Sequence, residues 1–366
     1  MNKEWTTLPF DECLEPTTKP HKIQTADYKV SGAFPIVSQE EVFISGYWDN
    51  IDDVFHITHP IVVFGDHTRV LKYVDFDFVV GADGVKILSP KSFLLPKFLF
   101  YYLIWLKVPS LGYSRHYKLL RETCVPIPSQ TEQAHIVGEL DLLSSILEKQ
   151  RLQLKELDTL AQSVFYDMFG DPVENEKGWG TGELNSVCDV RDGTHDSPSY
   201  QDKGYPLVTS KNITGDGISF SDVNYISQED FDAISKRSYV DDGDIVMPMI
   251  GTIGKPTIVR KEREFAIKNV ALIKFLPNSA VLNTFIRAII ASSSFDVYMR
   301  SKNKGGTQKF IALGDIRKLR IPVPPLGLQQ SFDIKIKAIE HEKALINQAI
   351  VETQKLIDYA MDKYFG

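Results

Sequence analysis

The chain contains one stretch twice: VPIPSQTEQAHIVGELDLLSSILEKQRLQLKELDTLAQSVFYDMFG at residues 125–170 returns, without a gap, as IPVPPLGLQQSFDIKIKAIEHEKALINQAIVETQKLIDYAMDKYFG at residues 321–366. The two copies are identical at seven positions, including both prolines of the P-x-P opening, Gln133 with Gln329, and the closing Phe-Gly. A repeat at one fixed offset indicates that a single structural unit occurs twice in the chain.

Each copy has the periodicity of a long helix with one apolar seam. Apolar residues recur in steps of four and three over ten places, which is the spacing of a coiled coil. Proline has no amide hydrogen and suits the start of each helix, and Gly170 suits an end. The simplest way to bury both seams is to pair the two copies with each other, and pairing between chains is the alternative. The polar seam residues Gln150, Lys343 and Thr353 are expected to tune the register.

The segments outside the repeat read as two globular domains of mixed α+β type. The predicted organisation is a first globular domain at 1–124, a first helix at 125–170, a linker at 171–183, a second globular domain at 184–320 and a second helix at 321–366. Strands are expected within 34–39, 59–66 and 205–210, and helices at 95–106 and 282–299. Residues 85–99 correspond loosely to 272–286, so the fold class is α+β with an internal pseudo-two-fold duplication.

Composition places the chain among ordinary globular proteins. Its 366 residues are 43% hydrophobic and 24% charged, which is enough for two or three cores. Three scattered cysteines form neither a disulfide framework nor a metal motif, so a cytoplasmic location is expected. The amino terminus has no signal-peptide pattern, and the most apolar run, 93–106, is too short for a membrane span and contains Lys97.

The net charge of −7 does not exclude nucleic acid, because the basic residues are clustered. Residues 107–121 contain four Lys or Arg and no acid, and residues 300–320 contain seven against Asp315 alone. Phosphate contacts act over a Debye length of about 10 Å, so a local basic patch is sufficient for DNA binding. A solvated loop is the alternative for either stretch.

Motifs for catalysis do not occur in the sequence. It has no Asn- or Asp-Pro-Pro-aromatic motif of an adenine methyltransferase, and GTIGKPT (251–257) has the wrong spacing for a P-loop. Residues 333–335 have the D-x-K form of a nuclease but fall on the predicted second helix. No cysteine accompanies His56 and His59, so no metal site is predicted there. Because the catalytic motifs are missing, no catalytic residue is predicted.

Taken with the repeat, several fragments resemble the specificity subunit of type I restriction-modification systems over essentially the full length. IPSQTEQ (127–133) and IPVPPLGLQQ (321–330) are similar to the proline-rich helix entrances of that family. In the second domain, DGTHDSPSY (192–200), TSKNI (209–213) and GGTQKFI (305–311) are similar to one kind of target-recognition domain; in the first, FGDHTR (64–69) and GYSRHYKLL (112–120) are similar to another. The resemblance implies that the two long helices pack as an antiparallel coiled coil. It also implies two unlike recognition domains and hence an asymmetric DNA target.

The resemblance also implies partners and a division of labour. The chain itself would be non-catalytic, with no cofactor of its own. Modification subunits, expected to number two, would bring S-adenosylmethionine and the adenine-methylating site, and motor-nuclease restriction subunits would bring ATP and Mg²⁺. A recognition subunit of a fused restriction-methylation enzyme is a close alternative, and a coiled-coil scaffold without DNA affinity is an alternative from another class.

Helix length sets a ceiling on the separation of the two recognition domains. Antiparallel helices of about 40 residues would hold domains at opposite ends at most about 60 Å apart, at about 1.5 Å per residue. This length spans roughly 17 base pairs at about 3.4 Å each. A target of two short blocks with a gap of fixed length and unspecified sequence is therefore expected.

Candidate DNA-contacting residues are those whose side chains suit base edges or phosphates and that lie in these fragments. They are, in the first domain, His67, Thr68, Arg69, Arg115, His116 and Lys118, and, in the second, Thr194, His195, Ser197, Tyr200, Ser210, Lys211, Asn212, Lys255, Lys304, Gln308 and Lys309. The competing interpretation is that Gly-Thr-His and Ser-Lys-Asn form turns in which the side chains bond their own backbone.

Overall fold

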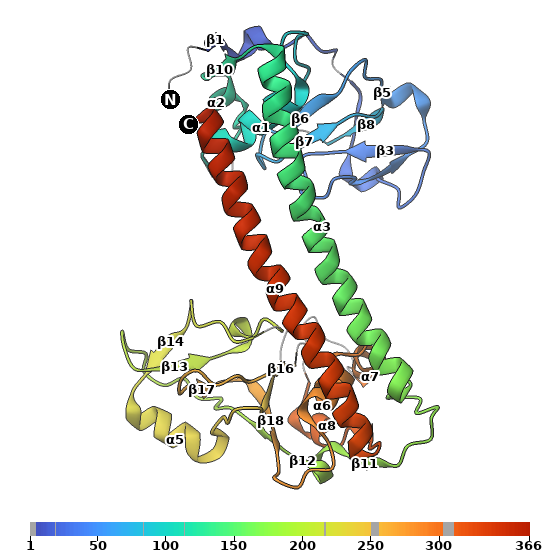
Figure 1. The fold of residues 1–366 in the computed structure, drawn as a ribbon, viewed down its shortest axis with the longest axis vertical. Helices are drawn as coiled ribbons and strands as arrows, with labels where there is room; N and C mark the ends of the chain where they lie inside the picture. Colours follow the sequence, from blue (N-terminus) through green and yellow to red (C-terminus); the bar gives the residue numbers. More distant parts are fainter. Residues whose placement is uncertain are drawn as a thin grey trace. The chain divides into compact units, whose positions relative to one another are not determined.

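The computed structural model describes residues 5–18, 20–82, 84–112, 114–215, 217–249, 256–302 and 311–366. The chain divides into two compact units (Figure 1): a first unit of Met1–Leu152 with Asn347–Gly366, and a second unit of Gln153–Ile346. Two helices, α3 (Gln130–Phe169) and α9 (Leu326–Phe365), run through both units. Each is 40 residues long.

The globular part of the first unit contains two small sheets. The larger sheet has the order β2-β8-β3-β4, and β5 also pairs with β8: Lys22–Ile23, Phe78–Gly81, Phe34–Val37, Gly46–Trp48 and Val54–Phe55. The smaller sheet has the order β7-β6-β9: Leu71–Val74, Ile61–Gly65 and Val85–Leu88. Helix α1 (Pro96–Leu106) follows β9, and the short α2 (Tyr117–Arg121) precedes β10 (Cys124–Ile127), which pairs with β1 (Thr6–Pro9).

The globular part of the second unit also contains two main sheets. One has the order β14-β13-β17: Asn224–Ile226, Tyr205–Val208 and Ala266–Ile267. The other has the order β12-β18-β15-β16: Cys188–Asp192, Val270–Phe275, Ile245–Pro248 and Thr257–Ile258. The helices are α4 (Leu184–Val187), α5 (Gln228–Ser238), α6 (Asn283–Ala291), α7 (Ser293–Lys302) and α8 (Leu313–Arg317).

The two globular parts share one strand topology, which confirms the predicted duplication. The order β4-β3-β8 in the first unit matches β14-β13-β17 in the second, with one antiparallel and one parallel pairing in each case. The order β7-β6-β9 matches β16-β15-β18. The correspondence of 85–99 with 272–286 is also confirmed, because both segments run from a strand into a helix: β9 into α1, and β18 into α6.

Helices α3 and α9 pack against each other within each unit, as the seam favoured, and they do so in antiparallel fashion, as the resemblance implied. In the first unit, Ile136 and Leu140 near the start of α3 share a core with Ile357 and Tyr364 near the end of α9. In the second unit, the end of α3 packs on the start of α9: the rings of Phe169 and Phe332 meet edge to face, with centroids 5.3 Å apart. The coiled coil is therefore formed within one chain.

Several seam positions depart from a simple apolar stripe. Lys343 is buried in the seam of the second unit and pairs with Asp158 of α3 at 2.8 Å. Phe165 and Phe169 each come one residue after a position of the four-and-three apolar spacing, yet they are almost fully buried. The reason is that α6 covers this side of α3: the Phe169 and Phe285 rings are 4.7 Å apart.

One glutamine in each repeat joins the helix pair to its globular part. The side chain of Gln133 is fully buried; its oxygen accepts a bond from the Leu95 amide (2.8 Å), and its nitrogen donates to the carbonyls of Phe93 (2.9 Å) and Pro128 (3.0 Å). Leu95 is the residue that caps α1. The identity at this position therefore has a structural cause, because an amide is the side chain that both accepts and donates.

Gln329 repeats the arrangement in the second unit. Its oxygen accepts from the Leu282 amide at the start of α6 (2.9 Å), and its nitrogen donates to the carbonyls of Ala280 (2.9 Å) and Pro324 (2.8 Å). Each amide thus satisfies one donor at a helix start and two carbonyls, of which those of Pro128 and Pro324 make buried contacts.

The bounds of several elements differ from those expected. Each long helix begins five residues later than its repeat, because strands β10 and β19 (Arg320–Pro322) occupy the P-x-P openings. Residues 181–183 at the end of the predicted linker form strand β11, which pairs with β19. The single helix expected at 282–299 is wrong: it is two helices, because the backbone is extended at Ser292, whose hydroxyl caps the start of the second one.

Within the part of the chain that the structure describes, no helix combines the length and apolar character needed to cross a membrane.

Candidate nucleic-acid interface

In the first unit, the candidates at 67–69 form a tight turn between β6 and β7. The turn is closed by backbone bonds between Gly65 and Val70 (2.8 Å) and between Arg69 and Gly65 (2.7 Å). Gly65 is required here, because a Cβ would lie 2.2 Å from the hydroxyl of Thr68. The Thr68 hydroxyl donates to the Gln39 carbonyl (2.6 Å). Thr68 and Arg69 are exposed at the turn, and His67 is half-buried.

The structure brings this turn together with the second candidate segment, 115–118. The link is Asp66: its carboxylate accepts from the Tyr117 amide (2.8 Å), and its carbonyl accepts from the His116 amide (2.8 Å). Arg115 and Lys118 are exposed on either side of this link. Segments about 50 residues apart in the sequence therefore form one polar surface, with cations on both.

His116 is corrected to a structural residue. Its ring is fully buried; Nδ1 lies 2.9 Å from the Asp66 carbonyl, and Nε2 accepts from the Leu111 amide at 3.0 Å. These partners use both ring nitrogens of a neutral histidine with its proton on Nδ1. No ring nitrogen is left for a base, because both serve to join Asp66 of the turn to Leu111.

An open pocket of about 510 Å³ lies beside this turn. It is lined by Thr68, Arg69 and Leu120, and also by Lys107 and Val108 at the end of α1. The guanidinium of Arg69 donates to the Val108 carbonyl (3.1 Å), which fixes its direction along the pocket. Lys107 belongs to the basic stretch but was not among the candidates, and the structure adds it to this surface.

In the second unit, the segment Gly193–Ser197 lies over the point where the chain passes from β17 to β18. Gly193 donates to the Val270 carbonyl (2.9 Å), and Thr194 donates to that of Ile267 (3.0 Å). A Cβ at Gly193 would lie 2.3 Å from the Ile267 carbonyl oxygen, so only glycine permits this approach. The Thr194 hydroxyl accepts from the Asp196 amide (3.1 Å), as the turn interpretation predicted.

His195 lies between two acceptor oxygens. Its Nδ1 is 2.7 Å from the Asn269 side-chain oxygen, and its Nε2 is 2.9 Å from the buried carboxylate of Asp192. Hydrogen bonds to both acceptors need a proton on each nitrogen, so Asn269 and Asp192 raise the pKa of His195 above its usual value. The ring is more than half exposed at the surface.

The neighbouring candidates Ser197 and Tyr200 are exposed. The Ser197 hydroxyl accepts from the ammonium group of Lys268 at 2.5 Å. Lys268 was not among the candidates. The signal for it was present, because Lys268 and Asn269 are a polar pair inside the apolar run FAIKNVALI (265–273), and they lie where the chain changes sheets.

The candidates 210–212 form a short 3-10 helix. Asn212 is corrected to a structural residue: its side-chain oxygen accepts from the Thr209 amide (3.0 Å), its nitrogen donates to the Asp222 carbonyl (2.8 Å), and it is buried. The competing turn interpretation is therefore right for Asn212. Ser210 is half-buried, and the exposed Lys211 pairs with Asp222 at 2.8 Å.

Lys255, Lys304, Gln308 and Lys309 lie outside the described residues. Among the residues that are described, no group of three or more His, Cys, Asp or Glu side chains is placed to hold a metal ion.

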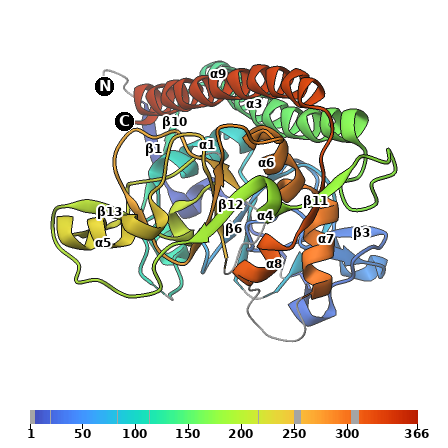
Figure 2. The same ribbon diagram turned by 90° about the horizontal axis from the view of Figure 1, so that it is seen from below.

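Helix α5 supplies Arg237, which, like Lys268, is a cation of the second unit that was not among the candidates. The helix lies beside β13 and β17 (Figures 1 and 2), where the Phe231 ring stacks on Tyr205 with centroids 4.2 Å apart. The Arg237 guanidinium pairs with the carboxylate of Asp192 and lines an open pocket of about 520 Å³ with Thr194, His195 and Ser197.

Comparisons with known proteins identify a family model, relatives by sequence and a solved structure that resemble this chain. Residues 176–352 match the family model of the type I restriction modification DNA specificity domain. The chain is 23% identical over 356 residues to the EcoR124I/EcoR124II specificity subunit of a type I restriction enzyme from Escherichia coli, covering 89% of this chain and 84% of the relative. It is 23% identical over 385 residues to the putative type I restriction enzyme specificity subunit S.HindORF215P of Haemophilus influenzae, covering 97% and 93%. A type I restriction-modification S subunit from M. genitalium has a similar fold, with a TM-score of 0.61 at 14% identity, covering 100% of this chain and 97% of that one.

Proposed function

We infer that this chain is a DNA specificity subunit of a type I restriction-modification system, the family of its matching domain and of its relatives. Such a subunit is not itself the catalyst; it binds DNA and assembles with methyltransferase and restriction subunits. The comparisons favour this function over a fused restriction-methylation enzyme and over a scaffold without DNA affinity.

One observation carries the proposal: a single globular fold occurs twice on one helix pair, and its two copies expose different polar side chains. The first copy exposes Thr68, Arg69, Arg115 and Lys118, and the second exposes His195, Ser197, Tyr200 and Lys211. These side chains suit base edges and phosphates. Since the two sets differ, we propose that each domain reads its own short block and that the complete site is asymmetric.

We further propose that helix length sets the gap between the blocks. Helices α3 and α9 are each unbroken for 40 residues, and a helix rises about 1.5 Å per residue. A gap of fixed length is expected of a rigid spacer, because each added turn moves the attachment points of the domains by a fixed amount.

The partners are proposed to follow the family plan. Two modification subunits would supply S-adenosylmethionine and the adenine-methylating site, and restriction subunits would supply ATP and Mg²⁺. The cofactors are assigned to the partners, since the sequence has no motif that would bind them.

Mapping methylated adenines tests the proposal. The host genome is compared with the gene intact, deleted and restored, and the purified complex with its methyltransferase subunits is titrated with matching and random duplexes. We expect a two-part site with a fixed gap that is methylated only when the gene is present. Unchanged methylation, together with equal affinity for matching and random duplexes, would refute the proposal.

A further inference from the structure

Arg237 and Asp192 form an ion pair in which the carboxylate is buried and the guanidinium is exposed. The Asp192 side chain is only 8% exposed, whereas that of Arg237 is 63% exposed. One carboxylate oxygen of Asp192 takes the Arg237 guanidinium, and the other lies 2.9 Å from Nε2 of His195. One face of the guanidinium is therefore held by the protein, and the rest of it faces solvent.

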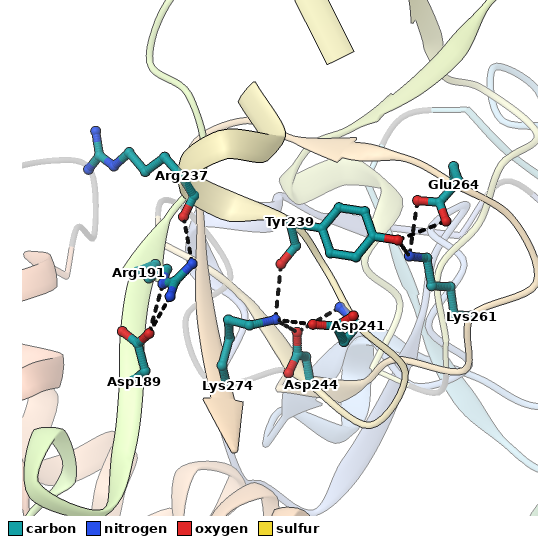
Figure 3. Close-up of polar contacts among 9 residues, drawn as sticks. All are labelled: Asp189, Arg191, Arg237, Tyr239, Asp241, Asp244, Lys261, Glu264 and Lys274. Atoms are coloured by element: carbon teal, nitrogen blue, oxygen red, sulfur yellow. Dashed lines mark hydrogen bonds and ion pairs between the residues drawn. The ribbon is translucent and has the colours of Figure 1, made fainter. Parts of the chain in front are cut away.

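Both members of this pair are fixed by the fold. Asp192 is the last residue of β12, where it lies opposite Ala271 of β18. Arg237 lies in the last turn of α5, and Figure 3 shows its backbone carbonyl turned toward Arg191, while its guanidinium points away from that cluster. Arg191 donates to this carbonyl at 3.0 Å and is itself held by Asp189 at 2.6 Å.

A second cation completes the anchoring of α5. Lys274 donates to the carbonyl of Tyr239, the residue that ends the helix, at 3.0 Å. Lys274 also pairs with Asp241 and Asp244 at 2.7 and 2.6 Å. Cations at the carboxyl end of a helix satisfy its free carbonyls and favour its dipole. Arg191 and Lys274 therefore hold the backbone at the end of α5, and Asp192 holds the Arg237 side chain.

We propose that Arg237 is a base-reading residue of the second domain, recognising a guanine, and that Asp192 is the positioning residue that orients it. This inference rests on the proposed function and adds to it a contact and its base. Arg presents a rigid fork of donors that matches the O6 and N7 acceptors of guanine in the major groove. Holding part of the fork on a carboxylate fixes the direction of the remaining donors, as base reading requires.

The charge balance favours a base over a phosphate. The pocket is lined by Arg237 and His195 and also by Asp196 and Asp230, and Lys268 and Asp192 contact its lining, so positive and negative groups nearly balance there. A phosphate contact depends on net charge, whereas reading a base depends on directed hydrogen bonds. The hydroxyls of Thr194 and Ser197 line the same pocket and add neutral polar groups beside the fork.

The test uses the complete complex with its methyltransferase subunits and a set of duplexes in which each base pair of the second domain's block is varied. The variants are Arg237→Lys, Arg237→Ala and Asp192→Asn. Lys236→Ala is the matched control, because it removes a positive charge from the same turn of α5. Circular dichroism and thermal unfolding verify that each variant is folded, and Arg237→Lys decides the outcome if Arg237→Ala does not fold.

We expect Arg237→Lys to lose the preference for guanine at one position, by about 5- to 150-fold, while preferences at other positions persist. Asp192→Asn should weaken the same preference, and Lys236→Ala should keep it. Retention of the full preference in Arg237→Lys would overturn the proposal. So would a uniform loss of affinity in Arg237→Ala with a reduced salt dependence, which marks a phosphate contact. A wild-type complex with no sequence preference would refute the proposed function and this inference together.

Discussion

Replacing Gln133 with glutamate perturbs the junction between the first globular part and the helix pair at a single functional group. Glutamate has nearly the same shape, and one of its oxygens can still accept from the Leu95 amide. It cannot replace the amide nitrogen, which donates to the carbonyls of Phe93 and Pro128. The substitution therefore removes two bonds at a fully buried position and leaves the packing unchanged.

The structure gives the magnitude of the effect. A buried acceptor left without its donor costs about 1–3 kcal/mol, so the loss of both bonds should cost at most about 6 kcal/mol, with the larger share at the buried Pro128 contact because the Phe93 contact is only partly buried. A glutamic acid that keeps its proton can donate one of the two bonds, which would reduce the cost to about half. Losses of this size are a large fraction of the stability of a domain, which is about 5–15 kcal/mol.

Hydrogen exchange followed by mass spectrometry can locate the effect, because local opening exposes the amides of the affected element. We expect faster exchange in residues 93–106 for Gln133→Glu and in residues 280–291 for Gln329→Glu, each without the other. Gln153→Glu is the control, since Gln153 lies on the exposed side of α3. If Gln133→Glu exchanges like this control, the amide does not hold the junction and the reasoning is refuted.

Three further predictions address function. Arg115→Ala should weaken DNA binding without moving the methylated site, because an exposed cation next to the turn contributes charge; unchanged affinity in a titration at matched salt would remove it from the surface. Inserting seven residues after position 152 and after position 346 adds about 10 Å of helix and should lengthen the gap by about three base pairs, as read from the methylation map; an unchanged gap would contradict the spacer. The pKa of His195, measured by NMR, should lie above 6.5 and fall in Asp192→Asn. Because the folded-state pKa is raised, the stabilisation is complete below about pH 6.5 and is lost as the pH rises through the raised value; a wild-type pKa at or below 6.5 would contradict the network.

The candidate site was predicted only in part. The turn at 67–69 and the segment at 194–197 were identified, and the structure places both beside further cations. His116 and Asn212 have the chemistry of DNA readers, but neighbours in the fold use their polar atoms. Arg237 was missed because nothing near it in the sequence shows that it meets Asp192, which lies 45 residues away.

Whereas pairing of the helices within one chain was left open against pairing between chains, the repeat, the two long helices and the duplication of the globular fold could be predicted from the sequence alone. These follow from apolar periodicity and from identity at a fixed offset, which are properties of neighbouring residues along the chain. Only the tertiary structure decided which polar side chains stay available to a ligand. Nδ1 of His195 and the carboxylate of Asp192 find partners 74 and 45 residues away, across sheets and helices that the local pattern does not align.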